Sequence, residues 1–348
     1  MKLLVADFLF VDAHKNMNIN IINALTQFAE VDVVSLNGFY EENNTFVNKK
    51  KINLQAISVE HRIGMLGARL YSLNLAQITG LILKNKFYDA VICLGFETIS
   101  FAFAIKYFYD LPIFLIYHKN IDELTNSVKL FFLKQYTNKV YHVVFEDFFA
   151  KRLIDLGVKS DRIFVVPHPI QEIKIQTITE KYDCVGLCNS NEELFIEEAI
   201  SKEKDFKHNN LSILLRSKSQ SKIVGSVSVI KGFIEKQRYD KIIGSGRTVL
   251  VPLPSTYIYR LSGSIYDALA RRKIVLTSSK FYSEEYSRRY PGTCFHVDSV
   301  NDLIQYLSNQ PNINANITGS FDKFLKDHSI DSTSKALEGM LKKIVKGK

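Results

Sequence analysis

The residues best suited to bind an anion lie in the segment Ser255–Ser279, STYIYRLSGSIYDALARRKIVLTSS. Within it, Ser262-Gly263-Ser264 offers two hydroxyl caps and a residue without Cβ where a helix begins, and Arg260 lies just before them. The start of a helix presents unpaired backbone N–H groups and the positive end of the helix dipole. We therefore predict an anion site here, of a kind suited to a diphosphate.

The elements on either side of this turn would position it. Val249–Leu253 is apolar and rich in β-branched residues, and prolines end it, whereas Ile274–Leu276 is typical of a buried parallel strand. Apolar residues at helical spacing connect the two. A second interpretation remains open: the segment could be a capped helix of an α/β core, whose serines and glycine serve only the turn.

Composition limits the class of protein. The 348 residues exceed one typical core, and 46% hydrophobic with 23% charged residues indicates a globular chain of two domains. The net charge is +9, of which the part after Ile178 carries +7, so phosphorylated molecules or an anionic membrane surface are expected partners. Nucleic acid is not expected, because the basic residues are scattered and accompany no nucleic-acid-binding motif.

Three further patterns concern cellular location. The four cysteines form no C-x2-C pair, which favours buried reduced thiols. The first residues, MKLLVADFLF, read as a strand because Asp7 interrupts the apolar run. Charged residues also break the apolar region Phe87–Tyr117 below the roughly 20 residues that a membrane span needs. We expect a cytoplasmic protein.

Strands and helices alternate along both halves of the chain, interrupted by Pro167-His168-Pro169 and a polar stretch. This predicts an α/β fold with two Rossmann-like domains that face a central cleft, where open parallel sheets bind ligands. The expected boundaries are an N-terminal domain at 1–172, a linker at 173–181, a second domain at 182–318 and terminal helices at 319–348.

Two passages resemble the GT-B glycosyltransferases, and in detail their family 4 of retaining enzymes. FEDFFAKRLIDLGVKSDRIFVVPHPI (Phe145–Ile170) is similar to the passage that ends the family's N-terminal domain. SGSIYDALARRKIVLTS (Ser262–Ser278) is similar to the pattern "G..l.EAmA.G.PVI.s" of the nucleotide-sugar domain. The resemblance implies an acceptor-side first domain and a donor-binding second domain.

The resemblance also assigns residues around the predicted anion site. The family has two glutamates separated by seven residues; Asp267, in the first turn of the helix, stands at the later one and is expected to bind a ribose. Tyr259 stands at the earlier one and would be a different partner for a sugar or phosphate. Arg260 with Ser262-Gly263-Ser264 fits a variant of the family, and Arg272 replaces the usual glycine.

Other donor contacts are expected after neighbouring strands. Arg216 and Lys222 would replace the basic pair with which the family holds the diphosphate, although a Lys/Ser-rich loop can equally be a solvated turn. Glu284 and Glu285 follow the strand Ile274–Leu276, near the expected nucleoside or sugar, and exposed acids at a helix start are the alternative.

Two histidines follow strands of the first domain. His118 comes after the strand Ile113–Tyr117, where the family often has a histidine that contacts the donor sugar, and its neutral ring can exchange one hydrogen bond with a hydroxyl. His14 lies in the loop on the acceptor side, which lacks the family's glycines. The alternative for each is an incidental loop histidine.

These observations predict a retaining glycosyltransferase that moves a sugar from a nucleotide diphosphate to a hydroxyl of a growing glycan, lipid-linked or free, in surface polysaccharide synthesis. His118, Arg260 and Asp267 are the expected catalytic residues. No DxD-like motif accompanies them, so neither a metal nor another cofactor is expected. Two alternatives stay open: a nucleotide-sugar 2-epimerase of the same fold, and a degenerate partner subunit without activity.

Membrane contact is a further prediction. The helix Ser127–Lys139 sets Val128, Phe131, Phe132 and Tyr136 against three lysines, and could lie on an anionic bilayer at the inner face of the cell membrane. A helix packed on its own sheet would show much the same pattern.

Overall fold

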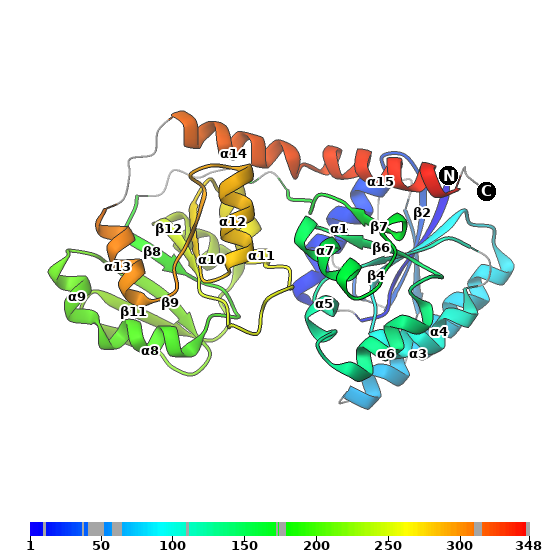
Figure 1. Ribbon diagram of the computed structural model, residues 1–348, viewed down its shortest axis with the longest axis horizontal. Coiled ribbons are helices and arrows are strands. Elements are labelled where there is room, and N and C mark those ends of the chain that lie inside the picture. Colours follow the sequence, from blue (N-terminus) through cyan, green and yellow to red (C-terminus); the bar gives the residue numbers. More distant parts are fainter. Residues whose placement is uncertain are drawn as a thin grey trace. The chain divides into compact units, whose positions relative to one another are not determined.

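The computed structural model describes residues 1–9, 12–36, 38–40, 52–57, 65–108, 111–171, 173, 179–309 and 315–345 (Figure 1). The chain forms two compact units. The first comprises Met1–Ile170, Tyr259–Leu261 and His328–Lys348, and the second comprises Gln171–Ile258 and Ser262–Asp327. Three residues from the middle of the second half therefore belong to the first unit. Of the predicted linker, residues 174–178 lie outside the described residues.

The first unit is built on a parallel sheet of seven strands in the order β3-β2-β1-β4-β5-β6-β7. Its strands are β1 (Lys2–Asp7), β2 (Glu30–Leu36), β3 (Ile52–Ile57), β4 (Ala90–Gly95), β5 (Ile113–Ile116), β6 (Tyr141–Val144) and β7 (Ile163–Val165). Every residue of β4 and β5 is buried. Unbroken apolar runs are expected of strands that are covered on both faces.

Helices cover both faces of this sheet (Figure 1). They are α1 (Asp12–Leu25), α3 (Met65–Asn85), α4 (Thr98–Ala104) with the 3-10 turn η1 (Ile105–Tyr107), α5 (Asn120–Glu123), α6 (Ser127–Tyr136), α7 (Asp147–Asp155) and α15 (Ile330–Val345). Apolar residues of α3, α4, α6 and α7 form one core with the sheet. Residues of α1 and the C-terminal α15 form the other core. The last helix of the chain therefore completes the first unit.

The second unit repeats this plan with the strand order β10-β11-β9-β8-β12-β13-β14. Its strands are β8 (Tyr182–Gly186), β9 (Ile213–Ser217), β10 (Lys222–Val224), β11 (Val227–Lys231), β12 (Gly246–Val251), β13 (Ile274–Thr277) and β14 (Cys294–His296). All neighbours are parallel except β10 and β11. Its helices are α8 (Glu193–Ser201), α9 (Glu203–His208), α10 (Lys236–Gly244), α11 (Gly263–Ala270), α12 (Lys280–Arg289), α13 (Val300–Ser308) and α14 (Ala315–Asp327).

An aromatic cluster fixes α11 in this unit. Tyr266 of α11 packs at ring-centroid distances of 6.1 to 6.4 Å against Tyr282 and Tyr286 of α12 and Phe324 of α14. All four rings are essentially buried. Because aromatic pairs add to the free energy of burial, the cluster holds the axis of α11, and with it the position of its first residues, firmly.

The predicted α/β fold with two Rossmann-like sheets is confirmed, and the terminal helices predicted at 319–348 correspond to α14 and α15. The hairpin β10–β11 and the helix α9 were not predicted; the hairpin was taken for a Lys/Ser-rich loop because its strands are short and half-exposed. Within the described residues, no helix is both long and apolar enough to cross a membrane.

Candidate functional site

The direction in which helices connect the strands reverses once in each sheet. In the first unit the reversal lies between β1 and β4, and in the second between β8 and β12. Ligands of open α/β sheets bind outside the carboxyl ends of the strands at such points. Each unit therefore has one such edge at which a ligand can bind.

Asn191 organises the loop that follows β8 in the second unit. Its Nδ2 donates to the carbonyl oxygens of Gly186, at 2.9 Å, and Arg216, at 3.0 Å. The next N–H, of Glu192, donates to the oxygen of Pro252 just after β12 at 2.8 Å. Asn191 is buried, yet its Oδ1 has no hydrogen-bond partner in the described chain. Such an acceptor is available to a donor group from outside the chain.

The start of α11 lies at the same edge, because the segment after β12 leads into it. Ser262 is the N-cap residue, and its backbone N–H donates to Tyr282 Oη at 3.1 Å. Its hydroxyl is buried and has no partner among the described residues. The N–H groups of Gly263 and Ser264 likewise donate to no described acceptor. A Cβ added at Gly263 would meet nothing within 4 Å, so the space beside this residue is open.

Asp267 lies one turn further along than the sequence suggested. The helix begins at Gly263 and has no acid in its first turn, so Asp267 belongs to the second turn. Its Oδ2 accepts from the Tyr239 hydroxyl at 2.9 Å, and both oxygens lie 3.3 Å from Arg271 Nε. Burial and the neighbouring Asp267 carboxylate raise the pKa of Tyr239 well above its usual value, which keeps that phenol a donor.

The two predicted basic residues of this unit are differently placed. Arg216, at the end of β9, donates from Nε to the Gly232 oxygen at 2.8 Å and so lies beside the Asn191 loop. Lys222 begins β10, the outermost strand, and not a loop as predicted. Three strand spacings separate β10 from β8, which is about 14 Å. The structure therefore does not bring Lys222 to the point where the connections reverse.

Glu285 lies in the second turn of α12 and not at the helix start. Its carboxylate pairs with Arg288 at 2.7 Å and with Arg289 at 3.8 Å. Its neighbour Glu284 is exposed and pairs with Lys280 at 3.7 Å. Both acids are thus engaged by basic residues of their own helix.

In the first unit, the buried carboxylate of Asp122 on α5 holds the segment Tyr259–Leu261. Asp122 Oδ1 accepts from the Tyr259 backbone N–H at 2.6 Å, and Oδ2 lies 3.2 Å from Arg260 Nε. The Tyr259 ring lies under the Arg152 guanidinium, 5.4 Å from its centroid. Sequence inspection grouped Arg260 with Ser262, but the two residues belong to different compact units.

His14 lies in the first turn of α1 and not in a loop as predicted. Its ring stacks on that of His118 at this edge of the first unit, with ring centroids 4.2 Å apart and 8° between their planes. His118 Nε2 donates to the Leu94 oxygen at 2.7 Å, because a carbonyl can only accept, so Nδ1 carries the lone pair. That buried Nδ1 has no partner in the described chain. Burial lowers the pKa of His118 well below its usual value, with His14 adding to the effect. The ring is therefore a neutral acceptor.

Burial, followed by the charges of Lys119 and Arg260, lowers the pKa of His14 to about 4. Both stacked rings are consequently neutral at pH 7. Protonating either ring would place a cation in a buried site, which costs free energy.

Asp7, at the carboxyl end of β1, was not singled out from the sequence except as an interruption of an apolar run. It is buried, and its carboxylate accepts from Asn18 Nδ2 and Tyr40 Oη, each at 3.0 Å, and from the Leu9 N–H at 3.1 Å. A Cβ at Gly95 would lie 2.6 Å from Asp7 Oδ1, so only glycine fits there. A charged residue at the end of an otherwise buried strand was the signal that could have identified it.

No protein-family model matches this sequence, and no curated protein matches it. Solved structures do. A glycosyltransferase from Rickettsia africae is 14% identical, with a TM-score of 0.69 over 100% of this chain and 99% of that one. HepE from Anabaena in complex with UDP-glucose is 11% identical, with a TM-score of 0.69 over 99% and 100%. UDP-GlcNAc 2-epimerase from Neisseria meningitidis is 14% identical, with a TM-score of 0.61 over 99% and 100%. The fold is that of the GT-B glycosyltransferases.

Proposed function

We propose that this chain is a glycosyltransferase that moves a sugar from a nucleoside-diphosphate donor to a hydroxyl group of an acceptor. The observation that carries the proposal is the start of α11, where the buried Ser262 hydroxyl and the N–H groups of Gly263 and Ser264 have no acceptor among the described residues and the space beside Gly263 is open. A diphosphate supplies the missing acceptors and the negative charge that a helix start favours.

The chemistry follows from this placement. Departure of a nucleoside diphosphate builds negative charge on the leaving oxygens, and fixed N–H donors stabilise that charge without reorganising. The leaving diphosphate then takes the acceptor proton, so no side chain must act as a strong base, and we propose transfer with retention and without a metal ion. Within the described residues, no group of three His, Cys, Asp or Glu side chains is arranged to hold a metal.

Side chains of both edges take roles in this proposal. Asp267, held by Tyr239 and Arg271, accepts a hydrogen bond from the donor ribose, and Asn191 Oδ1 accepts one from the nucleotide or its sugar. In the first unit, His118 Nδ1 accepts a hydrogen bond from a sugar hydroxyl, with His14 keeping its ring in place. Arg260 adds positive charge beside the Asp122 carboxylate.

The acceptor in this proposal is a growing glycan, lipid-linked or free, of surface polysaccharide synthesis, and the protein works in the cytoplasm at the inner face of the cell membrane. The excess of positive charge, +9 over the whole chain, supports a phosphorylated donor and an anionic surface as partners. The structural similarity to HepE in complex with UDP-glucose supports a uridine nucleotide as the first donor to test.

The test uses a panel of UDP-, GDP-, ADP- and dTDP-sugars with the full chain. We expect one nucleotide to raise the melting temperature and its sugar to be hydrolysed slowly by water. Ser262→Ala should weaken binding of that nucleotide by roughly tenfold, since one charge-assisted hydrogen bond is lost. Ser201→Ala, at an exposed helix end, is the matched control and should bind as the wild type does. A panel without any binding or turnover would refute the proposal.

The second candidate is a nucleotide-sugar 2-epimerase, which the similarity to the Neisseria meningitidis epimerase supports. The same panel separates the two reactions, because an epimerase releases an isomeric nucleotide sugar without any acceptor. A chain that bound nucleotide sugar but produced neither isomer, hydrolysis nor transfer would be a partner subunit without activity.

A further inference from the structure

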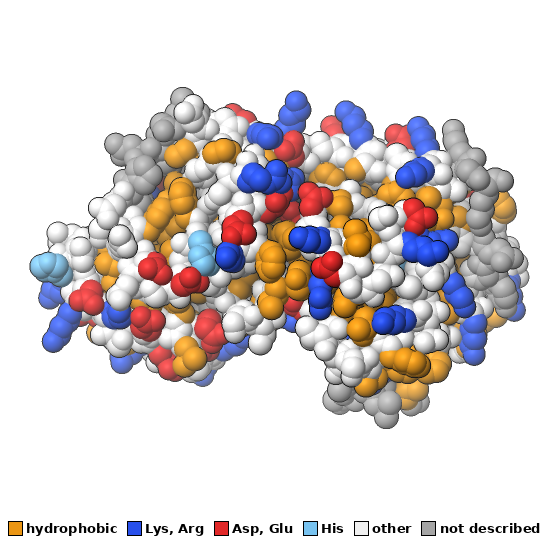
Figure 2. Space-filling model, viewed as in Figure 1, with side chains coloured by type: hydrophobic (Ala, Val, Ile, Leu, Met, Phe, Trp, Pro, Cys, Tyr) orange, Lys and Arg blue, Asp and Glu red, His pale blue; other side chains and the backbone are white. Residues whose placement is uncertain are grey.

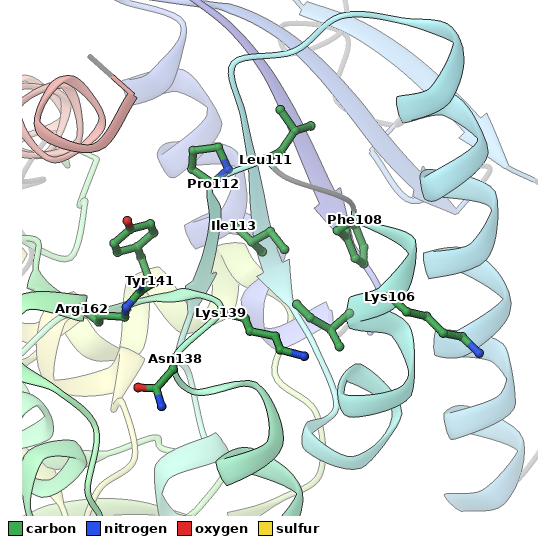
Figure 3. A pocket seen from close by; sticks show the side chains of 10 residues that line it. Lys106, Phe108, Leu111, Pro112, Ile113, Asn138, Lys139, Tyr141 and Arg162 are labelled. Carbon is green, nitrogen blue, oxygen red and sulfur yellow. The ribbon is translucent and has the colours of Figure 1, made fainter. Parts of the chain in front are cut away.

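A pocket of about 420 Å³ opens at the opposite edge of the first sheet (Figure 3). It lies where β5, β6 and β7 begin, whereas the candidate site lies where strands end. Three segments contribute its walls: η1 with the residue after it, the residues before β5, and the turn between α6 and β6 together with Arg162. Ligands of open α/β sheets bind at carboxyl ends, so this pocket is separate from the reaction of the proposed function.

The pocket is basic. Lys106, Lys139 and Arg162 line it, and no aspartate or glutamate is among the described residues of its lining. None of the three cations forms an ion pair with a described carboxylate. Figure 3 shows Arg162 beside Tyr141, where its guanidinium lies 4.9 Å from the ring centroid, Lys139 reaching toward η1, and Lys106 pointing outward at the rim. Cations gathered without a carboxylate partner among the described residues favour an anionic ligand.

The remaining walls are apolar. Ile105, Phe108, Leu111, Pro112 and Ile113 line the pocket beside the amide of Asn138. If the ligand were a free inorganic anion, these apolar side chains would stay exposed to water. A ligand that joins an anionic group to hydrocarbon would satisfy both kinds of wall.

An exposed aromatic patch adjoins the pocket along the chain. We define it as Phe103 of α4 with Val128, Phe131 and Phe132 of α6. Phe103, Val128 and Phe131 are 53%, 54% and 60% exposed, and the Phe132 ring lies 5.5 Å from those of both Phe103 and Phe131. The same helix turns Leu133 and Tyr136 inward to the core. Packing on the sheet therefore accounts for only one side of α6.

The patch and the pocket use the same elements. Phe103 precedes Lys106 by three residues, and α6 ends two residues before Asn138. Figure 2 shows hydrophobic side chains gathered with basic ones over the part of the first unit where Figure 1 draws α6 and α3. Exposed phenylalanines can enter the apolar interior of a lipid bilayer, and cations beside them that lack an ion-pair partner among the described residues can bind its anionic headgroups.

We propose that the pocket binds the phosphate headgroup of an anionic phospholipid while the aromatic patch enters the adjoining acyl region, so that this edge of the first unit docks on a membrane. The occupant is a lipid surface because its anionic headgroups match the cations and its hydrocarbon matches the exposed phenylalanines. An acidic protein would pair with the cations but would not account for phenylalanines of this exposure beside them. The docking does not depend on the reaction at the other edge.

The chain contains no tryptophan, so Phe131→Trp creates a single fluorescent reporter in the patch. The full chain is mixed with vesicles of phosphatidylcholine alone or with added phosphatidylglycerol. We expect sedimentation with the anionic vesicles only, a blue shift of the Trp emission, and quenching by brominated acyl chains. Ile223→Trp, on an exposed strand of the second unit, is the matched reporter and should shift in neither case.

Pocket variants test the headgroup site itself. Lys139→Gln and Arg162→Gln should each weaken binding to anionic vesicles about fivefold, and Phe131→Ser about tenfold. Lys151→Gln, an exposed lysine of α7 outside the pocket, should bind as the wild type does. Slow hydrolysis of the nucleotide sugar without vesicles should be unchanged in all four variants, which separates lost docking from a lost fold and from failure of the proposed function.

Three results would overturn the inference. Equal binding to vesicles with and without phosphatidylglycerol would exclude a headgroup site, and no binding to either would exclude membrane docking. Displacement from vesicles by inorganic phosphate, but not by chloride at equal ionic strength, would identify the pocket as a site for a soluble anion.

Discussion

The carboxyl edges of the two sheets share one topology but offer different hydrogen-bonding groups. In the second unit, the Ser262 hydroxyl and two N–H groups of α11 are donors without an acceptor among the described residues, and Asn191 Oδ1 is a single acceptor without a donor there. In the first unit, His118 Nδ1 is an acceptor without a described donor, and the carboxylate of Asp7 is already bonded. The difference teaches that the strand order fixes where a ligand can bind, whereas the loops decide which charge it should carry.

The largest effect is expected from Gly263→Asp. The new carboxylate would point into open space in front of α11 and repel a diphosphate, so nucleotide affinity should fall at least a hundredfold, roughly 3 kcal/mol. The fold should be retained, because an acid in the first turn of a helix is favourable. Calorimetric titration with the nucleotide and the melting temperature check both statements.

Gly319→Asp is the matched control. Gly319 lies on α14 of the same unit, and a Cβ there also meets nothing within 4 Å. This variant adds the same charge far from the start of α11 along the chain and should bind nucleotide as the wild type does. Equal losses in both variants would mean that net charge, and not the donors of α11, decides affinity.

Asp122→Asn tests the first unit. The amide oxygen can still accept from Tyr259, but Arg260 loses its carboxylate partner in a buried setting. We expect the free energy of unfolding to fall by about 2 kcal/mol. Urea unfolding measures it. Glu123→Gln, whose partly exposed carboxylate pairs with two lysines, should cost less than about 1 kcal/mol. Similar losses in the two variants would contradict the importance assigned to the Asp122 contact.

The next effect is the loss of folding stability at acidic pH. The folded state holds the pKa of His14 near 4, below the unfolded value of about 6.5, so its neutral form favours folding. This contribution is complete above pH 6.5 and is lost as pH falls from there toward 4. His14→Phe keeps a ring against His118 but binds no proton. Its unfolding free energy should therefore decline less steeply below pH 6.5, by up to about 1.4 kcal/mol per pH unit.

Urea titrations of wild type and His14→Phe between pH 7 and pH 5 measure this slope, and parallel slopes would contradict the prediction. The other histidines with lowered pKa values, His118, His142 and His168, also lie in the first unit. In mild acid, the rate of amide hydrogen exchange should accordingly rise in the first unit before it rises in the second. The two units would then differ in acid stability as well as in hydrogen-bonding groups.

The smallest effect is expected at Arg272, where the resembling family has glycine. Arg272 has a φ of +58°, a conformation that costs a non-glycine residue about 1 kcal/mol. Arg272→Gly relieves this strain but removes an exposed ion pair with Asp322, so a net stabilisation of about 0.5 kcal/mol is expected. Asp322→Asn alone should change stability by less than that. A destabilised Arg272→Gly would show that the ion pair outweighs the strain.

Much of the fold was predictable from periodicity. Buried strands such as β4 and β5 are unbroken apolar runs, which are recognisable in the sequence. The hairpin β10–β11 was missed, because β10 has only three residues, none of them buried, and so has no apolar pattern of its own. It pairs with β11, which in turn pairs with β9. Local sequence could not reveal that pairing.

The candidate site was predictable in part. Ser262-Gly263-Ser264 does begin a helix, as capping residues indicated, and His14 and His118 lie together as their positions after β1 and β5 allowed. Asp267 and Lys222 were misplaced, by one helical turn and by an unrecognised strand respectively. Asn191 was missed, because what distinguishes it is one unpaired buried oxygen.

By itself, the sequence determined the alternation of strands and helices, the presence of two sheets and the turn that begins α11, since these depend on neighbouring residues and on the period of apolar positions. Only the tertiary structure decided that Arg260 pairs with Asp122, that His118 is a neutral acceptor and that three cations share one pocket. Those properties depend on burial and on partners far apart in the chain, and a linear pattern records neither.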